Sequence, residues 1–128
     1  MERRRISSAM PLEQTFGYSR ALVVGDRVFV SGTAPVMPEG ADPPADAYSQ
    51  ARRCLEIILT ALAEADAGPE DVVRTRLYVT SSDHVEDVGR AHGEVFGDVR
   101  PATTGVVVAG LFDPRWLVEI EADAIIGR

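Results

Sequence analysis

The sequence predicts an α+β sandwich in which one mixed β-sheet carries two helices on one of its faces. Three observations support this: short runs that alternate as strands do, two longer runs with apolar residues at helical spacing, and the order β-β-α-β-α-β-β. The chain has 128 residues and a hydrophobic content of 45%, so it can bury about two-thirds of its unfolded surface. We therefore expect residues 1–128 to form a single domain that folds without a disulfide or a metal ion.

The first half of the chain predicts two strands, a loop and a helix. Residues 21–32 contain two β runs around a turn at Gly25-Asp26, and the proline-rich residues 35–46 are expected to form an exposed loop. The helix begins after Asp46, which is suited to cap its N-terminus, and ends before Gly68-Pro69. Its expected buried stripe comprises Ala51, Cys54, Leu55, Ile58, Leu62 and Ala65.

The second half predicts a strand, a helix and two final strands. Residues 72–80 alternate, so that one face carries Arg74, Arg76 and Tyr78 and the other Val73, Thr75, Leu77 and Val79. In the helix within residues 81–98, Asp83 and Glu86 have the spacing of a capping box. The buried stripe expected for this helix is Val85, Val88, His92 and Val95. The final strands lie within residues 103–110 and 117–125, around a turn that contains Asp113-Pro114.

Composition excludes several classes of function. The net charge of −7 disfavours nucleic-acid binding, and the basic run Arg3–Arg5 is expected to be a solvated terminus. The chain has 13 arginines and no lysine, so it cannot form a lysine Schiff base or complete a phosphate-binding P-loop. No apolar run is long enough for a membrane span or a signal peptide. We therefore expect a cytoplasmic protein that binds neither a membrane nor nucleic acid.

The chain offers few residues that favour metal binding. His84, His92 and Cys54 are its only soft ligands, and no two of them have a recognised metal-binding spacing. His92 lies on the apolar stripe of the second helix, which favours a packed or interface histidine over a ligand. Cys54 lies on the stripe of the first helix, which favours a core thiol over a nucleophile because burial raises a thiol pKa.

The last strand is the strongest candidate for chemistry. Alternation places its acidic residues on one face: Glu119, Glu121 and Asp123. The opposite face carries Val118, Ile120, Ala122 and Ala124. The acidic face is either solvated, or one of its carboxylates borders a cleft and acts as a general base or orients water.

A second candidate lies at the end of an earlier strand. Ser31-Gly32-Thr33 is either a bulged strand end or a place where backbone N–H groups bind a carboxylate or carbonyl oxygen. Tyr18 precedes the first expected strand and can close over such a pocket. The helix-free sheet face is only partly polar, which indicates contact with another subunit.

The ordered set of segments resembles the RidA/YjgF family. The matching pieces are "GYSRALVVGDRVFVSGTAPV", "AYSQARRCLEIILTALAEADAGPEDVVRTRLYVT", "RPATTGVVVAGL" and "LVEIEADAI". The resemblance implies a chorismate-mutase-like sandwich that assembles as a homotrimer around a barrel of sheets, with small-molecule pockets between subunits. The best-known members of this family hydrolyse reactive imine and enamine acids to 2-oxo acids and ammonia, as deaminases without a cofactor.

The resemblance assigns roles to individual positions. Tyr18 matches the pocket tyrosine of the family, and Gly32 matches the glycine whose backbone faces the ligand. Glu119 matches the carboxylate that positions the attacking water. The resulting site has Glu119 as its catalytic residue, no metal, and a substrate-binding set of Tyr18, Gly32, Thr33, Arg100, Thr103, Thr104 and Gly105.

This chain departs from the family pattern at two positions. The arginine that grips the substrate carboxylate normally follows Pro-Ala, but here Thr103 follows it, and Gly105 stands where a cysteine or larger residue is usual. A neutral hydroxyl does not replace a bidentate charged contact. Arg100 lies three residues upstream, about 10 Å away along an extended chain, and is the nearest replacement in sequence.

Two functions therefore remain open at this stage. One is hydrolysis of an imine or related electrophile that lacks the usual carboxylate. The other is a non-catalytic trimer that binds a metabolite or acts as a holdase. RNA cleavage, a third activity attached to the family, is disfavoured by the acidic charge and by the absence of a histidine pair.

Overall fold

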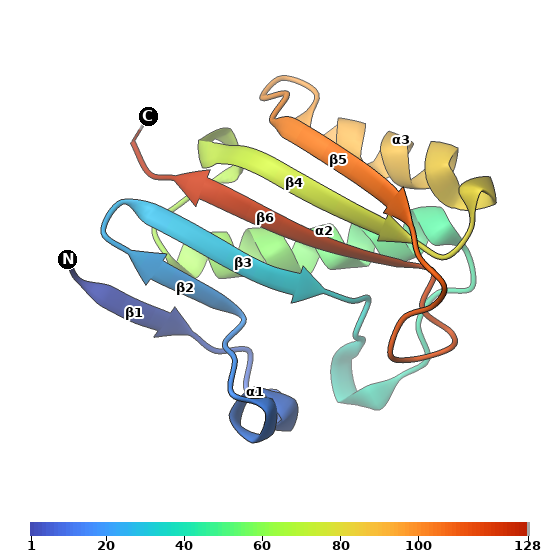
Figure 1. The fold of residues 1–128 in the computed structure, drawn as a ribbon, viewed down its shortest axis with the longest axis horizontal. Helices are drawn as coiled ribbons and strands as arrows, with labels where there is room; N and C mark the ends of the chain where they lie inside the picture. Colours follow the sequence, from blue (N-terminus) through green and yellow to red (C-terminus); the bar gives the residue numbers. More distant parts are fainter. Residues whose placement is uncertain (128) are drawn as a thin grey trace.

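The computed structural model describes residues 1–127, in which a mixed sheet lies against two long helices (Figure 1). The strands are β1 (Arg3–Ile6), β2 (Ala21–Val24), β3 (Arg27–Thr33), β4 (Val72–Val79), β5 (Ala102–Val107) and β6 (Val118–Ile125). The helices are α1 (Pro11–Phe16), α2 (Ala47–Glu64) and α3 (Val85–Phe96), with short 3₁₀ turns at Pro38–Gly40, Pro69–Asp71 and Ser82–His84.

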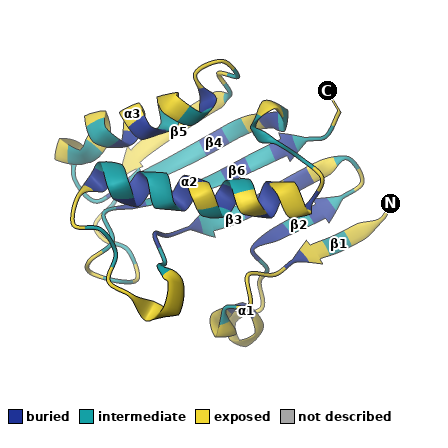
Figure 2. Cartoon of the chain, turned by 180° about the vertical axis from the view of Figure 1, so that it is seen from behind, coloured by how far each residue is buried: buried dark blue, intermediate teal, exposed yellow. Residues whose placement is uncertain are grey.

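The sheet is mixed, as the sequence predicts. Its order is β1-β2-β3-β6-β4-β5, and every neighbouring pair is antiparallel except β4 and β5, which are parallel because α3 connects them. The last strand of the chain, β6, thus lies in the interior of the sheet, whereas β5 lies at an edge. Helices α2 and α3 cover one face of the sheet (Figure 2).

Helix α2 forms the core against β3 and β6. Asp46 caps its N-terminus by accepting a hydrogen bond of 2.8 Å from the backbone N–H of Ser49, as expected from the sequence. All six residues of the predicted stripe are buried. Each large aliphatic side chain buried here stabilises the fold by about 1.5–3 kcal/mol, so α2 is the main anchor of the sheet.

The N-terminal arginines are largely solvated, as predicted, since Arg3 and Arg5 are exposed and Arg4 is half-buried, but they lie on a strand that the sequence reasoning did not predict. Arg3–Ile6 forms the edge strand β1 and pairs with β2 from Arg3↔Val24 to Ile6↔Ala21. Ile6 is buried, and the guanidinium of Arg4 donates to the carbonyl of Glu64 over 3.2 Å. Both features are compatible because long arginine stems can lie along a sheet while their charged ends stay in water.

Strand β4 differs from its expected alternation at one end. The register with β6 shifts between Val72 and Arg74, which marks a bulge. As a result Val72 is buried and Val73 is 41% exposed, so Val73 does not share the buried face of Thr75 and Val79.

Helix α3 also differs from the prediction at its start. His84 occupies the N-cap position without a side-chain cap, and the expected capping box of Asp83 and Glu86 is absent from the described residues. Ser81 instead caps the preceding 3₁₀ turn through the N–H of Asp83. Of the predicted stripe only Val88 is buried, His92 and Val95 are half-buried and Val85 is exposed, while Ala91 and Phe96 complete the buried side. No helix within residues 1–127 is both long and apolar enough to cross a membrane.

Candidate functional site

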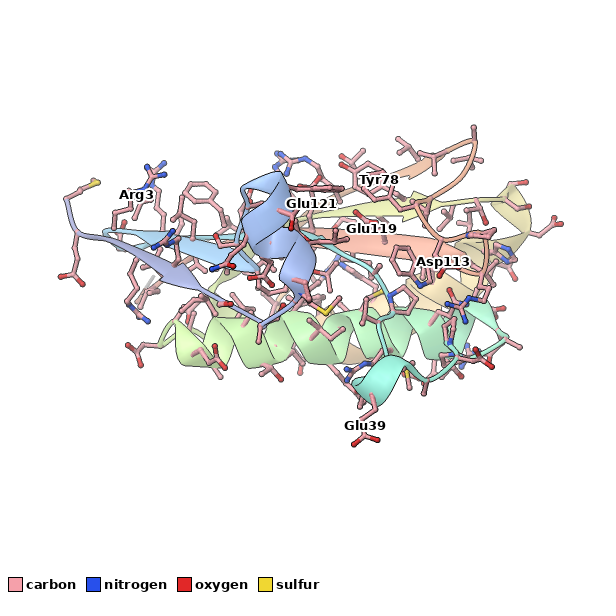
Figure 3. The ribbon with its side chains drawn as sticks, turned by 90° about the horizontal axis from the view of Figure 1, so that it is seen from below. Arg3, Glu39, Tyr78, Asp113, Glu119 and Glu121 are labelled. Atoms are coloured by element: carbon pink, nitrogen blue, oxygen red, sulfur yellow. The ribbon has the colours of Figure 1, made fainter. Side chains whose placement is uncertain are left out.

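Strand β6 presents a row of carboxylates on the face that no helix covers. Val118, Ile120, Ala122 and Ala124 are buried toward α2, and the alternating positions Glu119, Glu121 and Asp123 are half-buried, as the period of two predicts. Glu119, Glu121 and the neighbouring Tyr78 lie on the side of the sheet away from α2 (Figure 3).

The three carboxylates differ in their partners. Glu121 accepts a hydrogen bond from the Tyr78 hydroxyl, and Asp123 pairs with Arg76 over 3.5 Å. Within residues 1–127, Glu119 makes no hydrogen bond or ion pair. Burial raises the pKa of Glu119, the charge of Arg20 opposes this rise, and the charge of Glu121 adds to it. A half-buried, unpaired carboxylate with a raised pKa has the properties of a general base.

Glu119 lies directly against Gly32. The pairing of β3 with β6 shifts between Val30 and Thr33, and this irregularity brings Gly32 beside the carboxylate. A Cβ atom added to Gly32 would overlap Oε2 of Glu119. The structure therefore brings together two of the predicted site residues, and the absence of a side chain at residue 32 makes the room that Glu119 occupies.

Arg20 completes this cluster, and the sequence reasoning missed it. The side chain is 8% exposed, and its Nη2 donates a hydrogen bond to the carbonyl of Gly32. Its guanidinium carbon lies 5.8 Å from the ring centroid of Tyr18. The position of Arg20 could have been inferred from the two-residue turn at Gly25-Asp26, because this turn fixes the register of β2 against β3. That register places Arg20 opposite Ser31, whose N–H donates to the Arg20 carbonyl.

An open groove of about 1260 Å³ runs along this face beside α1. Its lining includes Arg5, Tyr18, Phe29, Ser31, Glu121 and Asp123. Tyr18 is exposed there. Thr33 is fully buried, and its hydroxyl donates to the Ser31 carbonyl over 2.8 Å, so its side chain supports the strand end instead of lining the groove.

Thr103 and Gly105 lie on the opposite face of the sheet. The parallel register pairs Thr103 with Thr75 and Gly105 with Leu77, whereas Thr104 pairs with Arg76 on the helix-free face. One chain therefore does not bring Thr103 or Gly105 together with Glu119. Arg100 precedes β5 with a left-handed φ of 55° and is exposed.

Thr103 ends a chain of three hydrogen-bonded side chains. Its Oγ1 lies 2.8 Å from Oγ1 of Thr75 and 3.0 Å from the Pro101 carbonyl, to which it donates. Oγ1 of Thr75 lies 2.8 Å from Nε2 of His92. Next to this chain, an apolar cavity of about 110 Å³ is lined by Leu77, Val79, Val85, Val88 and residues 105–107.

The remaining candidates behave as core residues. Cys54 is fully buried, and burial raises the pKa of its thiol strongly, so it is no nucleophile. His92 stacks at a tilt on Phe96, with 4.9 Å between ring centroids, and burial lowers its pKa. No group of three or more potential ligands within residues 1–127 is arranged to hold a metal ion.

The comparisons with known proteins agree with this architecture. The profile of the family described as endoribonuclease L-PSP matches residues 9–126. The crystal structure of Rv2704 from Mycobacterium tuberculosis, described as a member of the YjgF/YER057c/UK114 family, is 42% identical with a TM-score of 0.89, covering 98% of this chain and all of its own. The chain belongs to the RidA/YjgF family.

Two further proteins, one archaeal and one bacterial, are similar to this RidA/YjgF chain over most of its length. A RutC family protein of Pyrococcus abyssi is 36% identical, with 84% of each chain covered. TdcF of Escherichia coli, provisionally named a reactive intermediate deaminase, is 29% identical over 84% of this chain and 85% of its own. A crystal structure of TdcF with bound serine superposes with a TM-score of 0.79 at 26% identity, covering 95% of this chain and 93% of that one.

Proposed function

We propose that this protein hydrolyses small imines and enamines without a cofactor, in pockets shared between the subunits of a homotrimer. The observation that carries the proposal is the state of Glu119. Its carboxylate is half-buried, lacks a hydrogen-bond partner within residues 1–127, has a raised pKa and lies against the backbone of Gly32. This is the environment in which a carboxylate accepts a proton from water near neutral pH.

The chemistry follows from this arrangement. Glu119 accepts a proton from water as the water oxygen bonds to the carbon of the C=N group, and the π electrons move to nitrogen, which takes up a proton. The nitrogen of the carbinolamine then takes up a second proton, and the hydroxyl group loses its proton. The oxygen electron pair forms the C=O bond while the C–N bond breaks with its electron pair on nitrogen, so ammonia leaves. An enamine enters the same route once it has tautomerised to the imine.

The homotrimer supplies what one chain lacks. All six residues of the edge strand β5 are exposed, and the clusters around Glu119 and Thr103 lie on opposite faces of the sheet. A pocket containing both needs the β5 edge of one copy against the helix-free face of another. In that arrangement Tyr18, Gly32 and Glu119 face Thr103 of the partner subunit. The family resemblance favours three copies.

A second function is supported by a separate observation. Thr103 replaces the charged residue that would grip a carboxylate, so the same pocket can hold a metabolite without turning it over. TdcF, a relative, has been crystallised with bound serine. The second proposal is therefore a trimer that binds a small metabolite, or acts as a holdase, without catalysis.

The two functions are separated by an assay of imine hydrolysis. Imines are generated in situ from amino acids and from amino-acid amides by an oxidase, and loss of the semicarbazide-trapped species is followed. We expect wild type to accelerate hydrolysis and Glu119→Gln to be slower by about a hundredfold or more, because general bases contribute on that order. Glu64→Gln is the matched control, since it makes the same substitution at an exposed position on α2, away from this face, and should retain the rate.

Two results would contradict hydrolysis. Equal rates for wild type and Glu119→Gln would remove Glu119 from the reaction. Failure of wild type to accelerate any imine, together with a metabolite retained in native mass spectrometry, would replace hydrolysis by the binding function.

A further inference from the structure

The direction of each hydrogen bond in the chain His92–Thr75–Thr103 follows from counting hydrogens. A hydroxyl has one hydrogen, and that of Thr103 is donated to the Pro101 carbonyl. The hydrogen in the 2.8 Å contact between Thr75 and Thr103 therefore belongs to Thr75. Since Thr75 has no second hydrogen, it accepts from Nε2 of His92. All three bonds run the same way, and His92 carries its hydrogen on Nε2.

The inner part of the chain is shielded from water. Thr75 is fully buried, and burial of a hydroxyl is costly unless it is hydrogen-bonded. His92 is half-buried against Phe96, and burial lowers its pKa, so the ring is neutral near pH 7. The outer end behaves differently, because Thr103 lies exposed on the edge strand and can exchange the Pro101 carbonyl for another acceptor.

Thr103 is set up to donate to a ligand. Its oxygen already accepts from Thr75, and a chain of hydrogen bonds with one direction polarises the last hydroxyl as a donor. Gly105 and Val107 share its face of β5, and the cavity beside them is lined by aliphatic side chains and backbone without a charged group among the described residues. Such surroundings suit a neutral acceptor and disfavour an ion.

We propose that Thr103 is a specificity-determining donor to a neutral carbonyl or amide oxygen of the ligand, and that Thr75 and His92 are positioning residues that align it. The preferred ligand class is thus a neutral 2-imino or 2-oxo amide, not the corresponding acid. The inference rests on the proposed pocket between subunits, because it identifies the ligand class of that pocket.

The test compares pyruvamide with pyruvate, which differ only in a carboxamide against a carboxylate. Each is titrated into the assembled, ¹⁵N-labelled protein and followed by NMR. We expect wild type to bind pyruvamide at least about tenfold more tightly than pyruvate. Thr103→Val should weaken pyruvamide binding by about fivefold, the size of one net hydrogen bond, and Thr103→Ser should retain it.

The positioning role has its own readouts. Thr75 is buried and cannot reach the ligand, and Thr75→Val keeps its shape but removes its hydroxyl. The variant should nevertheless weaken pyruvamide binding by a factor of about two to five, because Thr103 loses the hydrogen bond that aligns it. His92→Phe should do the same through the next bond, and Thr75→Ser should restore binding. In wild type the ¹⁵N shifts of the His92 ring should report the Nε2–H tautomer, and Thr75→Val should allow both tautomers.

Several results would overturn the inference. These are pyruvate binding as tightly as pyruvamide, binding of neither probe, or unchanged pyruvamide affinity in folded Thr75→Val and His92→Phe. The same samples are assayed for imine hydrolysis, which separates the two proposals. Selective pyruvamide binding without hydrolysis would contradict catalysis alone, whereas hydrolysis without selectivity would contradict the assigned ligand class alone.

Discussion

The carboxylate of Glu119 occupies the space that a side chain at residue 32 would need. A Cβ atom on Gly32 would overlap Oε2 of Glu119, and the Gly32 carbonyl accepts a hydrogen bond from Arg20. Glycine, carboxylate and guanidinium therefore form one unit at the end of β3. The position of the carboxylate depends on the smallest of these three residues.

Gly32→Ala is expected to displace the Glu119 carboxylate and leave the fold intact. The overlapping atom is the end of a flexible side chain, and the φ of Gly32 is not in the left-handed region, so the backbone tolerates alanine. A misplacement of about 1 Å can lower a rate by about a hundredfold. Gly89→Ala is the control, because its Cβ would meet no atom within 4 Å and it favours the helix. Imine hydrolysis and thermal midpoints are measured for both variants, and an active Gly32→Ala would contradict the role of this contact.

Glu119→Gln is expected to stabilise the fold at neutral pH and to lose that effect in acid. Burial raises the pKa of Glu119 above its ordinary value of 4.5, against the opposing charge of Arg20. Because the folded state holds this proton more tightly, the favourable contribution is complete below pH 4.5 and is lost as the pH rises through the folded pKa. Ionised Glu119 therefore disfavours folding at pH 7, and neutral glutamine removes that cost.

Thermal midpoints at both pH values check this prediction. The midpoint of Glu119→Gln should exceed that of wild type at pH 7, and the two should converge near pH 4. Asp123→Asn should bring no such gain, because Asp123 pairs with Arg76 over 3.5 Å. A midpoint of Glu119→Gln below wild type at pH 7 would show that the carboxylate supports the fold.

The protein is expected to be a homotrimer in solution. Light scattering at micromolar concentration should give a mass near three times the 13.8 kDa chain. Val106 is 43% exposed on β5 and pairs with Tyr78 on the helix-free side. Val106→Asp should therefore leave the chain folded and dissociate the trimer, since burial of an unpaired carboxylate is costly. Thr60→Asp, on the exposed side of α2, should leave it assembled. A wild-type mass near that of one chain would exclude the shared pocket.

The sequence predicts the layout better than the site because its periodic signals are strong where one face is buried. The alternation of β6 and the stripe of α2 identify the core and place Glu119 on the open face. Strand β1 was not predicted because its three consecutive arginines show no alternation of apolar and polar residues. Its pairing with β2 depends on backbone hydrogen bonds, which the side-chain pattern does not reveal. The bulge at Val72 and the uncapped start of α3 depend on tertiary contacts, which local patterns do not encode.

The candidate site was predictable only in part. Gly32 and Glu119 meet as expected, and the hairpin register gives Arg20 its place. Motif residues alone do not predict that Thr103 and Glu119 lie on opposite faces of the sheet. This separation follows from the parallel register of β4 with β5, which pairs Thr103 with buried Thr75. The same register explains the hydrogen-bonded chain to His92, which lies 17 residues from Thr75 in sequence.

Thr103→Arg is expected to shift the protein toward 2-imino acids. An added Cβ on Gly105 would come no closer than 3.9 Å to Leu77, so a long side chain from residue 103 has room beside it. The variant loses the hydrogen bond from Thr75, which costs about 1 kcal/mol of stability. A charge-assisted contact with the carboxylate contributes about 1.5–3 kcal/mol, so hydrolysis of 2-iminopropanoate should rise about tenfold or more.

The control for this charge is Thr60→Arg. It adds the same guanidinium on the exposed side of α2, away from the proposed pocket and from the β5 edge. In the semicarbazide assay Thr103→Arg should be faster than wild type on 2-iminopropanoate, Thr60→Arg should match wild type, and Thr103→Arg/Glu119→Gln should be slow again. A wild type that is already fast would mean that another arginine, Arg100 first, binds the carboxylate. A folded but inert Thr103→Arg would mean that the pocket differs from that of the deaminases at more than this residue, which favours the binding function.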